Sequence, residues 1–198
     1  MSNSFPLARF SPQLLPALHR ALCALALVAV GATAVSAEPW PEPKSPAIPA
    51  ASGYVSIKGA AIPIRSDVVY RAVYDARLHA DDPAQLIPAI DMAGSELNAL
   101  AVEGVPLTQA KFVIVFHAAG IDGILDDAHY RTKFGCDNPN LPVIAQLKKA
   151  GVELYVCGQN LAYDHVDPKI LTPDVRVATD ALIVLMTLEN QGYALLSY

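Results

Sequence analysis

The sequence predicts an α/β protein with a three-layer, doubly wound, mostly parallel sheet of about five strands and helices on both faces. Strand-like and helix-like segments alternate from Asp67 onward, which is typical of parallel strands joined by crossover helices. Residues 112–116 form a continuous apolar run, as expected of a strand buried on both faces. The length of 198 residues allows one full-sized domain, and the charged content of 17% argues against a disordered chain.

The strands are expected where β-branched and aromatic residues gather. Residues 68–75 form the first predicted strand, and the apolar run at 112–116 forms the second. Residues 152–156 form the third. Short segments at 175–177 and 193–197 complete the predicted sheet.

Helices are expected between these strands. The apolar positions within residues 86–101 follow helical spacing, and Pro88 indicates that this helix begins or kinks near it. A second helix is expected from a cap at Asn138 to a stop at Gly151, and a third over residues 179–191. Residues 126–131 predict a further helix or lid over the cleft.

The N-terminal segment has the order of a cleavable secretory signal peptide over residues 1–37. Arg9 and Arg20 precede an apolar run at 21–30, and small residues lead to a cleavage site after Ala37. The alternative is an uncleaved membrane anchor, although the apolar run is short for a bilayer. We therefore expect a periplasmic or secreted protein that meets a membrane only through an uncleaved signal.

Residues 38–66 form a Pro-rich arm or linker with six prolines. Proline fixes φ and removes backbone donors, so this segment is expected to be a tether or an arm along the domain surface. The α/β domain is then residues 67–198. The net charge of −5 gives no support to nucleic-acid binding, which normally shows a basic patch.

Candidate chemistry lies at the carboxyl ends of the predicted strands, where ligands bind in open doubly wound sheets. Asp75 closes the first strand, His117 follows the second, Cys157 follows the third, and residues 178–180 follow the fourth. Cys157 is the strongest candidate, because Gly158 follows it and leaves the sulfur uncovered. The alternative is a buried cysteine that only fills space.

Three groups of residues resemble the DsrE/DsrF-like family of small sulfur-relay proteins. The first is Tyr-Val-Cys-Gly-Gln-Asn-Leu-Ala at 155–162, preceded by residues 147–153. The second is Lys-Phe-Gly at 133–135 with Asn-Pro-Asn at 138–140, and the third is Gly-Tyr-Ala at 192–194. The resemblance runs from about Val68 to the C-terminus.

This resemblance implies a homo-oligomer, trimeric or hexameric, in which the cysteine at position 157 carries sulfur as a persulfide. Partner proteins would donate and accept the sulfur, and any activity would be at most that of a sulfur carrier or sulfurtransferase-like protein. Gly158, Gln159 and Asn160 follow the cysteine in the same motif and would be supporting residues of the cleft. The predicted export signal departs from the pattern of the family, because its best-known members are cytoplasmic.

Two further cleft residues are expected from the predicted elements and not from the resemblance. His117 should lie beside Cys157 at its strand end, or be an ordinary hydrogen-bonded histidine at the sheet edge, and Tyr130 belongs to the helix or lid at 126–131.

A second cysteine, Cys136, allows a disulfide with Cys157 as an alternative to sulfur transfer. Cleavage after Ala37 leaves only Cys136 and Cys157, and an even cysteine count in an exported protein is typical of disulfides. The pair can form a structural disulfide, a reversible redox pair or two independent thiols. A thiol–disulfide redox protein is therefore one alternative, and a non-catalytic oligomeric binding or scaffold module is another.

No metal and no cofactor are expected. The histidines at 117, 129 and 165 could join Cys157 and Asp126 or Asp127 as ligands, but no pair has a recognised ligand spacing. The sequence also lacks a dinucleotide-binding glycine motif, a P-loop and a nucleophile elbow.

Overall fold

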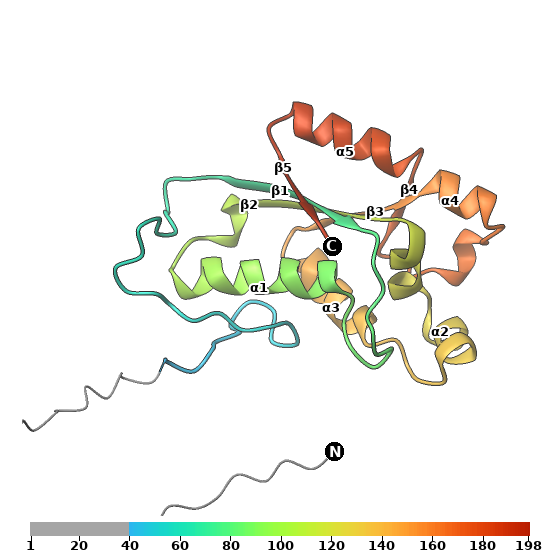
Figure 1. Cartoon of the computed structure of the whole chain (residues 1–198), viewed down its shortest axis with the longest axis horizontal. Helices are drawn as coiled ribbons and strands as arrows, with labels where there is room; N and C mark the ends of the chain where they lie inside the picture. Colours follow the sequence, from blue (N-terminus) through green and yellow to red (C-terminus); the bar gives the residue numbers. More distant parts are fainter. Residues whose placement is uncertain (1–39) are drawn as a thin grey trace, which may run out of the picture. The chain divides into compact units, whose positions relative to one another are not determined.

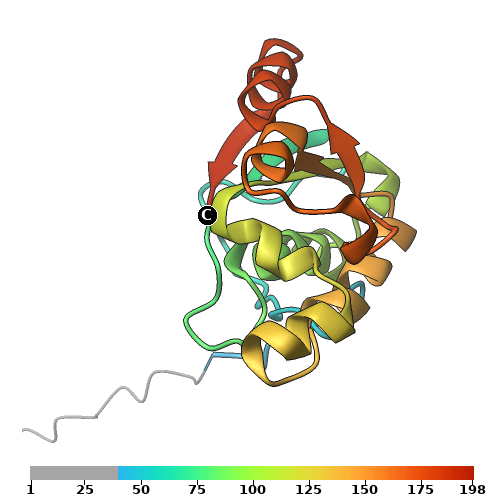
Figure 2. The ribbon, with the colours of Figure 1, turned by 90° about the vertical axis from the view of Figure 1, so that its right-hand side faces the viewer.

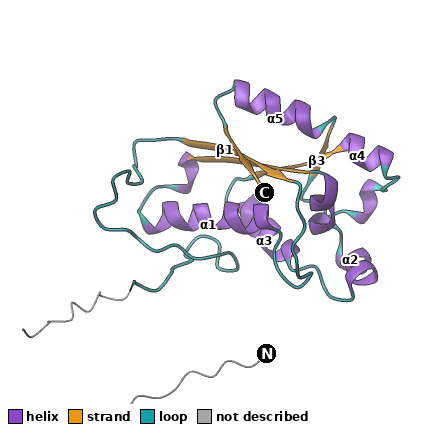
Figure 3. Cartoon of the chain, in the orientation of Figure 1, coloured by secondary structure: helices purple, strands orange, loops and turns teal. Residues whose placement is uncertain are grey.

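The computed structural model describes residues 40–198, which form a five-stranded parallel sheet between two layers of helices (Figure 1 and Figure 3). This architecture confirms the predicted fold class. The expected signal peptide at 1–37 and its cleavage site after Ala37 lie outside the described residues.

All strand pairs are parallel, and the sheet order is β4-β3-β2-β1-β5. The chain steps outward from β1 to β4 and then crosses back to place β5 on the free side of β1. All carboxyl ends therefore lie at one edge of the sheet. The strands are β1 (Tyr70–Ala76), β2 (Ala110–Phe116), β3 (Glu153–Cys157), β4 (Arg176–Ala178) and β5 (Ala194–Ser197).

Helices cover both faces of the sheet. α1 (Pro88–Val102) and α3 (Asn140–Lys149) lie on one face, and α5 (Ala181–Asn190) crosses the other (Figure 1 and Figure 2). Pro88 is the first residue of α1, as expected of a residue whose missing N–H costs nothing there. The shorter elements are η1 (Leu107–Gln109), η2 (Ala118–Ile124), α2 (Asp127–Phe134), α4 (Gly158–Tyr163) and η3 (Pro168–Ile170).

The strands send alternate side chains into two separate apolar clusters. We call the larger one, on the α1 and α3 side, the lower core; it includes Tyr74, Phe116, Leu97 and Ile144. The smaller one, beneath α5, is the upper core, and it consists of Val73, Val113, Val115, Cys157, Ala181 and Leu185. The period of two along each strand explains this division.

The described part of the Pro-rich arm packs against α1. Ile48 is fully buried, and the Asn98 side chain accepts from the amides of Ala47 and Ile48 at 2.9 and 2.8 Å. A Cβ at Gly94 would lie 2.4 Å from the Cβ of Ala51, so the arm approaches the helix where a side chain is missing. This part of the chain is therefore an arm along the domain surface.

Candidate functional site

Cys157 is the last residue of β3 and belongs to the upper core, with 3% of its surface exposed. Gly158 begins α4 immediately afterwards. A Cβ at Gly158 would lie 2.6 Å from the carbonyl oxygen of Ala178, so a larger residue would push β4 away. Glycine therefore lets the chain turn sharply behind the sulfur.

The Cys157 sulfur accepts a hydrogen bond of 3.3 Å from the amide of Ala181. Ala181 is the first residue of α5, and Asp180 caps this helix by accepting from the amide of Ile183 at 3.0 Å. Free amides at a helix N-terminus favour negatively charged acceptors. The fold thus directs the start of α5 at the thiol.

His117 lies beside Cys157 at the carboxyl edge. Phe116 pairs with Val156 in the register of β2 and β3, so the residues that follow them are neighbours. His117 keeps an extended backbone, with φ −155° and ψ 175°. Its side chain therefore leaves the sheet on the same face as Val115 and Cys157.

The imidazole of His117 contacts Asp75 at the end of β1. Its Nε2 atom is hydrogen-bonded to Oδ1 of Asp75, while the Ser197 hydroxyl donates to Oδ2 at 2.9 Å. The side chains of His117 and Asp75 are only 16% and 13% exposed. Arg77 lies at the rim, with Nε 4.0 Å from Oδ2 of Asp75. The carboxylate of Asp75 thus links β1, β2 and β5 at this edge.

From the sequence, Asp75 was predicted only to close a strand, and no role was predicted for Ser197. Their pairing depends on β5 returning to the free side of β1, where Asp75 and Ser197 are register partners. In the sequence, the only indication of this pair is that a polar residue stands at the end of each of the two strands.

Asn160 connects the cysteine segment to the histidine segment. Its Oδ1 accepts from the amide of Ala118 at 3.3 Å, and Ala118 has a left-handed φ of 47°. Non-glycine residues with this conformation gather at functional sites. Gln159, also singled out from the sequence, has an exposed side chain in the first turn of α4.

A cavity of about 430 Å³ lies between α5 and the β3–β4 end of the sheet. Its residues include Val113, Tyr155, Val184 and Leu188, so much of the lining is apolar. Residues 178–180 form part of the wall, and Ala178 is the register partner of Cys157. The cavity therefore reaches the end of β4 beside Cys157, although Cys157 itself is not among its lining residues.

The structure places Tyr130 and Cys136 away from Cys157. Tyr130 is buried in the lower core, where its hydroxyl donates to the carbonyl oxygen of Pro83 at 2.8 Å and its ring packs on Phe134. Cys136 packs against the same lower core, whereas Cys157 belongs to the upper core. Both thiols are free.

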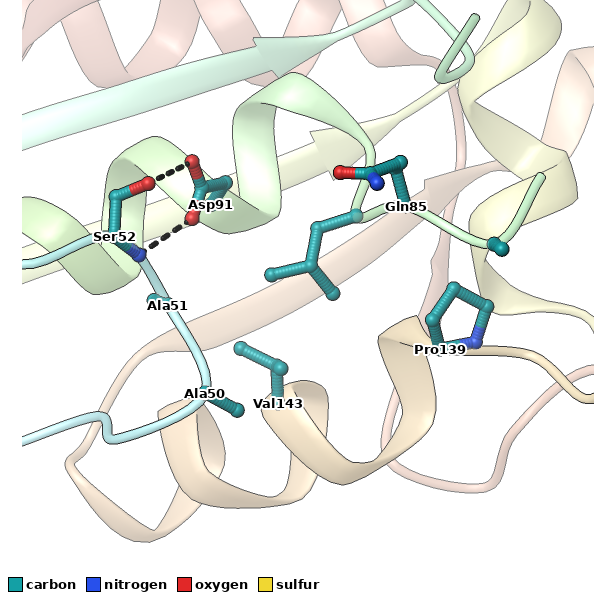
Figure 4. Close-up of a pocket in the computed structure, with 9 residues that line it drawn as sticks. Ala50, Ala51, Ser52, Gln85, Asp91, Pro139 and Val143 are labelled. Carbon is teal, nitrogen blue, oxygen red and sulfur yellow. Dashed lines mark hydrogen bonds between the residues drawn. The ribbon is translucent and has the colours of Figure 1, made fainter. Parts of the chain in front are cut away.

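A second cavity, of about 510 Å³, lies on the α1 and α3 side (Figure 4). Its acidic residue, Asp91, accepts from both the amide and the hydroxyl of Ser52 at 2.7 Å. Figure 4 shows both oxygens directed at Ser52. The carboxylate therefore fastens the arm to α1.

Two further features bear on the site. Within residues 40–198, no group of three or more His, Cys, Asp or Glu side chains is arranged to hold a metal ion. In the same part of the chain, no helix has both the length and the apolar character needed to cross a membrane.

Fold and site together define a small α/β protein with a thiol at the carboxyl edge of a parallel sheet. The chain belongs to the DsrE/DsrF-like family, whose model matches residues 74–198. It is also similar to the structure of a protein of unknown function from Methanobacterium thermoautotrophicum, with 18% identity and a TM-score of 0.47. That similarity covers 65% of this chain and 99% of the other. No functionally curated protein matches the chain.

Proposed function

We propose that this protein relays sulfane sulfur as a persulfide on Cys157. The observation that carries the proposal is the amide of Ala181 directed at the sulfur from the start of α5. The reactive form of a cysteine is the thiolate, and a helix N-terminus is one of the surroundings that favour it. Membership of a sulfur-relay type of family supports the same chemistry.

The exchange needs no cofactor. The Cys157 thiolate attacks the outer sulfur of a donor persulfide, a new S–S bond forms, and the donor leaves as a thiolate. An acceptor thiolate then attacks the outer sulfur on Cys157 and returns the cysteine to its starting state. Atoms and electrons balance, because sulfane sulfur moves between thiols without net oxidation.

Transfer of labelled sulfur tests the proposal. The protein is loaded from a ³⁵S-labelled persulfide, separated from the donor and mixed with a small acceptor thiol. We expect Cys157→Ser to carry no label and Cys136→Ser to carry and release it like the wild type. Equal labelling of Cys157→Ser and the wild type would refute the proposal.

An oligomeric scaffold is the second candidate, and the outer face of α5 favours it. Leu182, Ile183 and Met186 are more than half exposed, as is Val177 on the neighbouring edge strand β4. Contiguous exposed apolar residues of this kind mark protein interfaces. We propose that copies of the chain assemble through this face, as trimers or hexamers.

Light scattering measures the assembly directly. Met186→Glu is expected to reduce the molar mass toward that of one chain, whereas Leu195→Glu, on the other edge of the sheet, is not. A monomeric wild type would refute assembly through α5.

The redox alternative requires a bond between Cys136 and Cys157. Their places in separate cores do not support it.

Export is a separate proposal that rests on the sequence of residues 1–37. Expression with this segment in a Gram-negative host should give periplasmic protein that begins at Glu38. Retention of the whole chain in the cytoplasm would contradict it.

A further inference from the structure

We propose that His117, held by Asp75, is the base that takes the thiol proton of Cys157 and returns it to the departing thiol. The inference rests on the proposed sulfur relay, and it assigns a catalytic role to His117 and a positioning role to Asp75. It follows from the hydrogen bonds at the carboxyl edge and from the register of three adjacent strands.

The contact with Asp75 fixes the tautomer of the imidazole. A carboxylate only accepts hydrogen bonds, so Nε2 of His117 carries the hydrogen in this pair. Nδ1 of the neutral ring then holds a lone pair. Among residues 40–198, Nδ1 has no hydrogen-bond partner, so it is free to accept a proton.

Strand register makes His117 and Cys157 neighbours at the carboxyl edge, while the ring itself is hydrogen-bonded to Asp75 on the other side of β2. The base role therefore requires Nδ1 to reach the sulfur directly or through one water when substrate binds. β2 and β3 are adjacent parallel strands, and His117 and Cys157 follow the paired residues Phe116 and Val156. Both side chains leave the same face of the sheet. The amide of Ala181 donates to the sulfur, and this leaves the thiol hydrogen available to a different acceptor.

The surroundings keep the ring in place. The Ser197 hydroxyl donates to the second oxygen of Asp75, which fixes the carboxylate in turn. Asn160 accepts from the amide of Ala118, directly after His117. A held base with a carboxylate behind it is the arrangement by which many enzymes activate a nucleophile.

The step is balanced. Nδ1 of His117 takes the proton of the Cys157 thiol, and the thiolate attacks the outer sulfur of a donor persulfide. The donor S–S bond breaks as the new Cys157 S–S bond forms. The donor thiolate then takes the proton from the imidazolium and leaves as a thiol.

Few other charged groups face this pair. Asp75 and Arg77 lie at the end of β1, and Asp180 caps α5 with its carboxylate. Tyr155 lies two residues before Cys157 on the same face of β3, where its hydroxyl donates to Glu153 at 2.6 Å and accepts from Arg176 at 2.6 Å. The first residues of α4 are uncharged.

The test measures two rates on the folded protein at pH 7 and at pH 10. One is alkylation of Cys157 by iodoacetamide, located by peptide mass spectrometry, and the other is sulfur loading from glutathione persulfide. The variants are His117→Gln and Asp75→Asn. The control is His129→Gln, which removes another histidine paired with an aspartate, because Nδ1 of His129 lies 2.7 Å from Asp126 on the exposed α2.

We expect His117→Gln to slow both reactions at pH 7 by about tenfold, less than the roughly 10²–10⁴-fold typical of a general base, because a free thiol is already a few per cent ionised at this pH. At pH 10 hydroxide ionises the thiol without help, so the variant should approach the wild-type rates. Asp75→Asn keeps the imidazole, and both rates should fall several-fold at pH 7. His129→Gln should have the wild-type rates.

Wild-type rates for His117→Gln at pH 7 would overturn the proposal, as would an equal loss at both pH values, which indicates a structural role. Should His117→Gln lose its circular dichroism spectrum, Asp75→Asn decides by the same criteria. A wild-type protein that takes no sulfur, yet whose alkylation depends on His117, would refute the relay and leave the base assignment intact.

Discussion

The amide of Ala181 donates to the sulfur of Cys157 across 3.3 Å, joining the start of α5 to the end of β3. The two residues are 24 positions apart in the chain, and both belong to the upper core. The contact exists because β4 lies beside β3 and the chain passes from β4 into α5, whose first residue is then next to the thiol.

Removal of this hydrogen-bond donor should lower the reactivity of the Cys157 thiol. Proline at the first position of a helix is compatible with the fold but has no N–H, so Ala181→Pro removes the bond to sulfur. We expect alkylation of Cys157 at pH 7 to slow by about tenfold, which corresponds to about 1.4 kcal/mol, at the upper end of the net contribution of a typical hydrogen bond. Leu182→Pro is the matched control, since it places proline in the same turn and keeps the Ala181 amide. Equal rates for the two variants would show that the amide does not act on the sulfur.

Asn98→Ala should release the arm from α1. The Asn98 side chain accepts from the amides of Ala47 and Ile48 and donates to the carbonyl oxygens of Ile48 and Ser52, both at 3.1 Å. The substitution leaves buried backbone groups without partners, so the free energy of unfolding should fall by about 2–3 kcal/mol in urea titrations. Asn98→Asp keeps one acceptor oxygen but turns the other against the carbonyl oxygens of Ile48 and Ser52 at a fully buried position, so it should lose at least as much. A wild-type midpoint for Asn98→Ala would mean that the arm is not held there.

Two tyrosines form a matched pair in the lower core. The hydroxyl of Tyr74 is buried without a hydrogen-bond partner among the described residues, and burial raises its pKa strongly. The hydroxyl of Tyr130 donates to Pro83. Tyr74→Phe should therefore leave the free energy of unfolding unchanged or raise it by up to about 1 kcal/mol, whereas Tyr130→Phe should lower it by about 1 kcal/mol. The reverse order in chemical denaturation would contradict this assignment.

The cap of α2 should show a pH-dependent effect. The backbone amide of His129, and then its side chain, hydrogen-bond to Asp126 and lower the pKa of that carboxyl. A lowered pKa in the folded state contributes stability above the ordinary aspartate range, and this contribution is lost as the pH falls through the lowered value. Asp126→Ala should therefore reduce the melting temperature at pH 7, with a smaller deficit at about pH 2.5. Asp126→Asn still caps without a charge and should match the wild type only at the acidic pH. A deficit for Asp126→Ala that is independent of pH would contradict the role of the charge.

The sequence predicted the sheet and the position of the thiol because both depend on local signals. Strand-forming residues mark β1 to β5, and the rule for carboxyl ends placed His117 beside Cys157. Pro88 marked the start of α1 in the same way. These features need only the neighbouring residues and the parallel topology.

Features that depend on tertiary contacts were not predicted. α4 was missed because Gly158 indicates a turn, and the six-residue helix is too short for a periodic pattern. Tyr130 was expected in the cleft, but α2 turns it into the lower core, where its hydroxyl donates to the carbonyl oxygen of Pro83. A polar Asn98 within an apolar helix gave no sign that it would hold the arm.

The most direct test of the sulfur relay is the intact mass of the chain from Glu38 to Tyr198, which contains Cys136 and Cys157, before and after incubation with polysulfide, with and without reductant. The account predicts two free thiols in the untreated protein. It also predicts a gain of one sulfur atom that maps to Cys157, is removed by reductant, and is absent from Cys157→Ser. A mass that falls by two hydrogens through a Cys136–Cys157 disulfide, or that gains no sulfur at Cys157, would contradict the account.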